Sequence, residues 1–127
     1  RITARSTANG NPALSAMTFQ YSISNDSTLA NVTLEDTTLN QSHDCSVHAS
    51  TISCSSIPAG LGSLRSPKTV QLFGDIASTN EINPYLHIKI NRPGGPASAG
   101  DITWTDGETT FTWVPLRQPV AEGTSWR

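Results

Sequence analysis

The sequence predicts an all-β protein: one domain folded as an antiparallel β-sandwich or flattened β-barrel, with about eight short strands and one disulfide. Serine and threonine make up 32 of the 127 residues, and Ala, Glu, Leu and Lys never gather into a stretch with 3.6-residue periodicity, which argues against any long helix. Short alternating runs are instead separated by Gly, Pro and Asn turns. A chain of 127 residues buries enough surface for one core, so no second domain is needed.

The clearest element is a hairpin over residues 101–114. Asp106-Gly107 is typical of a two-residue type I′ turn between two alternating runs. Such a turn sets Trp104 opposite Thr109, with the apolar side chains on one face and the threonines on the other. The aromatic residues expected in the core, from this hairpin and the first strand, are Phe19, Tyr21, Trp104, Phe111 and Trp113.

The rest of the chain follows the same pattern of strands and turns. An irregular arm over residues 1–12 precedes the first strand, at 18–24, which we expect to form a hairpin with the alternating run that follows a turn at residues 25–28. The remaining elements are two strands within 45–54, a loop at 57–64, strands at 69–73 and 85–90, a Gly- and Pro-rich surface loop at 91–100, and a tail at 115–127.

Cys45 and Cys54 are nine positions apart, and a hairpin turning at Ala49-Ser50 places them opposite each other. That geometry fits a disulfide. Three N-glycosylation sequons lie in the same part of the chain, at Asn25, Asn31 and Asn40. With only two lysines in the chain, these features predict a secreted, extracellular protein.

Charge and hydropathy exclude some functions. The basic residues are scattered without a stripe and the net charge is −2, so we expect no nucleic-acid partner. The chain has no run of 18 apolar residues, so we expect no membrane span. The chain begins at Arg1 rather than Met, which is expected of a secreted protein after signal-peptide removal and also of an excised fragment. We expect a monomer.

A catalytic centre is not evident in the sequence. Ser98 lies in a Gly-rich segment, but Pro96 occupies the position where a nucleophile elbow requires glycine. Most of the carboxylates are next to turn residues, although a sandwich can still bring two of them together, as a glycosidase requires. The candidates are Glu35, Asp36, Asp44, Asp75, Glu81, Asp101, Asp106, Glu108 and Glu122.

The three histidines do not have the spacing of a metal site. His43 and His48 are five residues apart, an odd spacing that places them on opposite faces of a strand, and His87 is distant in sequence. We therefore expect no metal and no cofactor. Aromatic residues also stack on sugars in β-sandwich binding modules, and the alternation leaves Tyr85 and Trp126 uncommitted to the core.

The cysteine pair, the clustered sequons, the Ser/Thr-rich and lysine-poor composition and the compact β-fold together resemble the small secreted proteins of filamentous fungi. Among these the chain is similar to the hypersensitive-response-inducing elicitors of plant pathogens, some of which have a thaumatin-like β-sandwich. The resemblance implies a non-enzymatic protein that is sensed at the plant cell surface, by a receptor or through a cell-wall polysaccharide.

Three functions therefore remain open. The first is an apoplastic elicitor or effector that triggers plant defence or cell death. The second is a carbohydrate-binding or enzyme-inhibitor module of the extracellular space, which an exposed aromatic strip at Tyr85 or Trp126 would favour. The third is a carbohydrate-active hydrolase or lyase, which a cleft with two carboxylates about 5 to 10 Å apart would favour.

Overall fold

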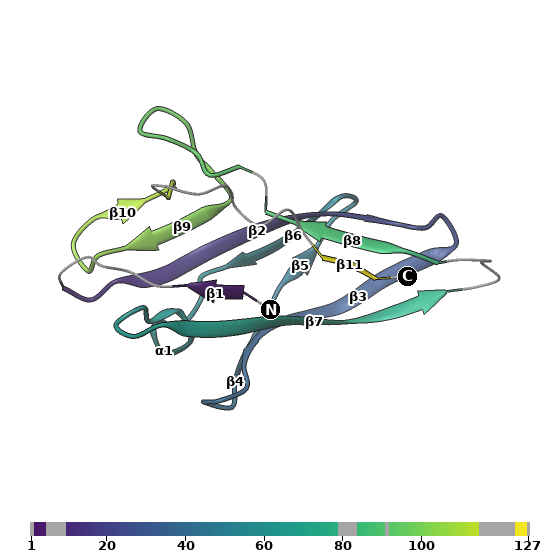
Figure 1. Cartoon of the computed structure of the whole chain (residues 1–127), viewed down its shortest axis with the longest axis horizontal. Coiled ribbons are helices and arrows are strands. Elements are labelled where there is room, and N and C mark those ends of the chain that lie inside the picture. The colour runs from purple at the N-terminus through teal and green to yellow at the C-terminus, as the bar shows by residue number, and fades with distance from the viewer. Residues whose placement is uncertain (1, 5–9, 79–83, 91, 115–123, 127) are drawn as a thin grey trace.

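The protein is a β-sandwich of two antiparallel sheets, as the sequence predicts (Figure 1). The computed structural model describes residues 2–4, 10–78, 84–90, 92–114 and 124–126. One sheet has the strand order β1-β7-β3-β4, and the other has the order β10-β9-β2-β6-β5, with β8 and β11 joined to it beside β2. The strands are β1 (Ile2–Ala4), β2 (Ala13–Ile23), β3 (Ser27–Asp36), β4 (Gln41–Asp44), β5 (Ser46–Val47), β6 (Thr51–Ser55), β7 (Lys68–Ser78), β8 (Leu86–Lys89), β9 (Ile102–Thr105), β10 (Thr110–Phe111) and β11 (Thr124–Trp126).

The core lies between the sheets and comes mainly from alternate residues of β2, β3 and β6. Phe19 and Met17 of β2 are nearly inaccessible to solvent, as are Leu34 of β3 and Ile52 of β6. The alternation expected for the first strand is therefore confirmed, although β2 begins five residues earlier than the range expected from sequence. Each fully buried side chain of this size stabilises the fold by about 1.5–3 kcal/mol.

Three local expectations are wrong. β2 and β3 do not form a hairpin, because the turn between them carries the chain from one sheet to the other. Ile2–Ala4, expected within an irregular arm, forms β1 and pairs with β7. The segment 57–64, expected to be a loop, contains the short helix α1 (Ala59–Gly62). Its apolar side chains fall at helical spacing and are buried in the core, namely Ile57, Leu61 and Leu64.

The hairpin at 102–111 exists, but its register differs from the expected one. Phe111 pairs with Trp104, and only Gly107 of the turn has a positive φ, at 108°. Asp106 instead accepts backbone hydrogen bonds from Glu108 and Thr109, which makes a four-residue loop. The shift of two residues preserves the side-chain alternation, so the faces of the strands are as expected.

β8 and β9 lie end to end along one edge of β2. They lie on the edge of β2 that faces away from β6. Gln20 pairs with β6 on one side and β8 on the other, and Met17 pairs with β6 on one side and β9 on the other. Lys89 ends β8 opposite Gln20, and Ile102 begins β9 opposite Met17. Gln20 and Met17 are three residues apart on β2, whereas their partners Lys89 and Ile102 are thirteen residues apart. Ten residues are therefore inserted into what would otherwise be one continuous strand. This insertion overlaps the surface loop expected at 91–100, and it projects from the sheet (Figure 1).

Candidate functional site

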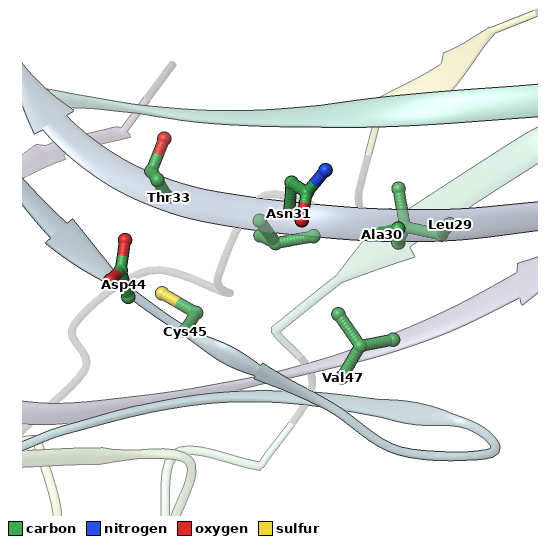
Figure 2. Close-up of a pocket in the computed structure, with 8 residues that line it drawn as sticks. Leu29, Ala30, Asn31, Thr33, Asp44, Cys45 and Val47 are labelled. Atoms are coloured by element: carbon green, nitrogen blue, oxygen red, sulfur yellow. The ribbon is translucent and has the colours of Figure 1, made fainter.

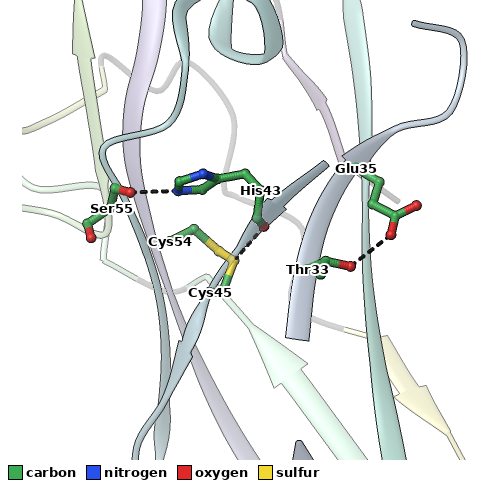
Figure 3. Close-up of a disulfide and its surroundings, with 6 residues drawn as sticks. All are labelled: Thr33, Glu35, His43, Cys45, Cys54 and Ser55. Carbon is green, nitrogen blue, oxygen red and sulfur yellow. Dashed lines mark hydrogen bonds between the residues drawn. A yellow bond between two sulfur atoms is a disulfide. The ribbon is translucent and has the colours of Figure 1, made fainter. Parts of the chain in front are cut away.

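The predicted disulfide between Cys45 and Cys54 is confirmed, and it fastens the corner where the chain changes sheets (Figure 3). Ser46 pairs with Ser53 in the next rung, which sets the two cysteines opposite each other. The Cys45 amide donates to Val32 of the other sheet, 2.8 Å away. The bond therefore connects the two layers as well as closing the local hairpin.

His43 strengthens the same corner. Its Nε2 atom lies 2.7 Å from the Ser55 carbonyl oxygen, to which it must donate because a carbonyl can only accept (Figure 3). The bond runs from β4 to the end of β6, which belongs to the other sheet. His48 and His87 are exposed. Among the described residues, no three His, Cys, Asp or Glu side chains are grouped as metal ligands would be.

An open depression of about 440 Å³ lies beside the disulfide, between β3 and the β4–β5 corner (Figure 2). It forms where the pairing of β3 with β7 shifts between Ala30 and Thr33, and Asn31 in the bulge has a φ of 49°. Figure 2 shows the β3 residues along one side and Asp44, Cys45 and Val47 along the other. The walls mix apolar and polar side chains, without a cluster of charges.

The three sequon asparagines are all exposed, so each has room for a glycan. They follow β3 from one end to the other, with Asn25 in the turn before it, Asn31 in its bulge and Asn40 in the turn after it. The Asn31 amide also donates to Asp75 of β7 at 2.8 Å. Glycosylation at these positions stays a prediction.

The buried carboxylate of Asp36 organises a turn. It accepts hydrogen bonds from the Thr38 and Leu39 amides, and it lies 3.3 Å from Nζ of Lys68, which also donates to the Gly60 carbonyl of α1. Burial raises the pKa of Asp36, but the Leu39 hydrogen bond, the Lys68 ammonium and the Thr38 hydrogen bond outweigh it and leave the pKa below its usual value. The group is therefore ionised and structural at neutral pH.

The buried carboxylate of Asp101 holds the base of the loop between β8 and β9. Its Oδ2 accepts the Arg92 amide and its Oδ1 accepts Nε of Arg92, both at 2.9 Å. The Asp101 amide in turn donates to the Arg92 carbonyl at 2.7 Å, and the Asp101 carbonyl accepts from Thr18 of β2. Charge-assisted bonds of this kind are stronger than neutral ones, so the two ends of the loop are joined firmly.

The other carboxylates in the described part of the chain are exposed or partly exposed. Hydrogen bonds from the Thr109 and Glu108 amides lower the pKa of Asp106, which is thus committed to its turn. The register places Glu35 and Asp44 diagonally across β3 and β4, a position in which residues are about 7–8 Å apart. Asp44 is exposed, and Glu35 accepts a hydrogen bond from Thr33. Glu81 and Glu122 lie outside the described residues.

The expected core aromatics divide into two groups. Phe19 is in the core, and Tyr21 and Trp104 pack partly buried against it. Phe111 and Trp113 keep intermediate exposure and are not part of the buried cluster of described residues, so the expectation is wrong for them. β10 is the outer strand of its sheet, which leaves Phe111 stacked on Trp104 with ring centroids 4.4 Å apart.

An exposed aromatic pair lies at the start of β8. Tyr85 is 38% exposed, and its ring centroid is 5.2 Å from that of the exposed His87. Sequence reasoning left Tyr85 uncommitted, and the structure places it at the surface. The side chain of Trp126 lies outside what the structure describes, although its backbone pairs with Leu86.

The loop formed by Arg92 to Asp101, hereafter the 92–101 loop, is the most prominent candidate site. It ends in a tight turn, with Gly95 and Ser98 bridged by two backbone hydrogen bonds and Pro96 and Ala97 exposed at the tip. Ser98, considered above as a nucleophile, is exposed beside this turn. Ordering ten backbone residues costs on the order of 10–20 kcal/mol, so the contacts at the base of the loop must offset a large entropy loss.

A scan against protein-family models, a search of curated proteins and a search of solved structures each found no match. Among the described residues, no helix is long and apolar enough to cross a membrane. Any proposal about function therefore depends on the site itself.

Proposed function

We propose that this protein is a secreted, non-enzymatic elicitor that a plant cell recognises through surface loops. The observation that carries the proposal is the role of the two carboxylates that are buried among the described residues. Asp36 fixes the turn that follows β3, and Asp101 fixes the 92–101 loop. Both buried charges hold surface segments in one conformation.

Rigid surface loops favour recognition for a physical reason. A loop that is already ordered loses less entropy when it binds, so more of its contact energy contributes to affinity. Binding residues are accordingly often placed on loops that a rigid scaffold positions. The Cys45–Cys54 disulfide and the three exposed sequons support an extracellular setting for such a scaffold.

The test is infiltration of the purified, disulfide-bonded protein into leaves, with cell death and defence responses scored against dose. The matched control is the same protein denatured and then reduced and alkylated, with unfolding verified by circular dichroism. We expect the folded protein alone to elicit the response. Absence of any response to folded protein would refute the proposal.

Recognition and catalysis differ in how they respond to single substitutions. Recognition is spread over a surface, whereas catalysis depends on a few groups. We therefore expect Glu35→Ala and Asp44→Ala, which change the two carboxylates placed diagonally across β3 and β4, to retain the response. Loss of activity in either folded variant, together with a glycan that only the original protein hydrolyses, would replace the proposal with a glycosidase.

The exposed Tyr85–His87 pair favours a second candidate, a carbohydrate-binding module of the cell wall. An exposed aromatic ring next to a polar ring can stack on a sugar and hydrogen-bond its hydroxyls. A pull-down with insoluble cellulose, chitin and β-glucan tests this candidate. Binding that Tyr85→Ala removes and the exposed-residue control Leu39→Ala keeps would support the module.

A further inference from the structure

We infer that the 92–101 loop is the receptor-contacting element of this protein, and that its partner is a protein surface with an uncharged, aromatic-lined pocket. The inference rests on the proposed elicitor function. It begins from the fact that β8 and β9 pair with the same edge of β2 and are in register except for ten added residues. The sheet would be continuous without them.

The number ten matters because it is even. Side chains alternate between the two faces of a strand, so removing an even number of residues leaves every later side chain on its original face. Ile102 to Thr105 would keep their places in the sheet. The pairing of β8 and β9 with β2 therefore does not require the insertion, which points to a role at the surface.

The structure also holds the insertion in one shape. Asp101 is 2% exposed and bonds Arg92 at the base. Gly94 has a φ of 76°, and a Cβ atom there would lie 2.5 Å from the Gly100 nitrogen, so the two arms of the loop approach as closely as glycine permits. Two further backbone bonds, Gly100 to Thr112 and Val114 to Pro93, join these arms to the chain after β10.

The chemistry of the tip indicates the kind of partner. Residues 93–100 carry no charged side chain, and Pro96 and Ala97 are both exposed. Proline has a fixed φ and loses little entropy on binding, and its ring packs well in aromatic-lined grooves. The one charge of the loop that reaches solvent is at its base, where the Arg92 side chain is 60% exposed. An acidic group at the rim of the partner's pocket would complement it.

The first experiment deletes residues 92–101, which removes both partners of the ion pair and all ten inserted residues. Deleting both charges together avoids leaving Asp101 buried without Arg92. We expect this shortened protein to fold, with an unchanged circular dichroism spectrum and cooperative unfolding, and to elicit no leaf response. A folded shortened protein with full activity would overturn the inference and leave the elicitor function standing.

The second experiment changes only the tip, so it does not depend on the deletion. Ala97→Glu adds a charge that an uncharged pocket must desolvate, and we expect the dose for half-maximal response to rise at least about tenfold. Ala49→Glu, in the exposed turn between β5 and β6, is the matched control and should leave the dose unchanged. Equal responses from the two variants would refute the inference. An inactive parent protein would instead refute the elicitor function.

Discussion

Opening the Cys45–Cys54 disulfide should destabilise the protein by an amount that the structure allows us to work out. The bond closes a loop of about ten residues, for which the chain-entropy model gives about 2.7 kcal/mol at 25 °C. Reduction leaves both sulfur atoms in place, so this entropy is the main loss. Replacing both cysteines with alanine also removes the sulfur of Cys54, which is 1% exposed in the core, and should cost about 1 kcal/mol more.

The assay is urea unfolding of the oxidised, reduced and doubly substituted proteins, followed by tryptophan fluorescence. For a chain of this length, 2.7 kcal/mol corresponds to a fall in Tm of about 10 °C. Because Cys45 joins the two sheets, the amide that it donates to Val32 should also exchange faster with deuterium after reduction. Equal stability of the oxidised and reduced proteins would refute the reasoning.

Three other substitutions test features of the fold. Asp36 has a lowered pKa in the folded state, so its contribution to stability is present above the unfolded pKa and is lost as the pH falls through the folded pKa. Asp36→Asn should therefore make the free energy of unfolding depend less on pH below about pH 5. Gly94→Ala should destabilise by about 1–3 kcal/mol in thermal unfolding, because φ is positive and the methyl meets backbone, whereas Gly95→Ala meets only ordinary contact and should be near neutral. Trp104→Phe removes the 2.8 Å bond from the indole nitrogen to the Trp113 carbonyl and should cost about 1 kcal/mol in urea unfolding; no change would mean that solvent replaces the bond.

Local sequence signals predicted the features that depend on near neighbours. The cysteine pairing needed only a hairpin turn within ten residues, and the Gly- and Pro-rich loop at 91–100 needed only its breakers. The turn at Asp106-Gly107 shows the limit of such signals. Its dipeptide suits a two-residue turn, but the Asp106 side chain captures two amides and lengthens the loop.

Features that depend on distant pairing were beyond the sequence signals. Nothing local shows that the turn at residues 24–26 leads to the other sheet, because either sheet offers β3 an apolar face. That the 92–101 loop interrupts one strand appears only when both sides are paired with β2. The helix α1 was missed for another reason: its glycines and Pro58 indicate a loop, while Ile57, Leu61 and Leu64 follow a helical period.

The central position of β2 has a consequence for how the chain folds. Its eleven residues pair with β6, β8 and β9, and the last of these lies more than eighty residues further along the chain. Closing so long a segment before the pairing can form makes folding slow, on the millisecond to second scale of β-sandwiches. During synthesis, one edge of β2 stays without its final partner until residue 105 has emerged, while the hairpin that carries the disulfide is already complete. The oxidised hairpin therefore provides a local nucleus against which the late strands can dock.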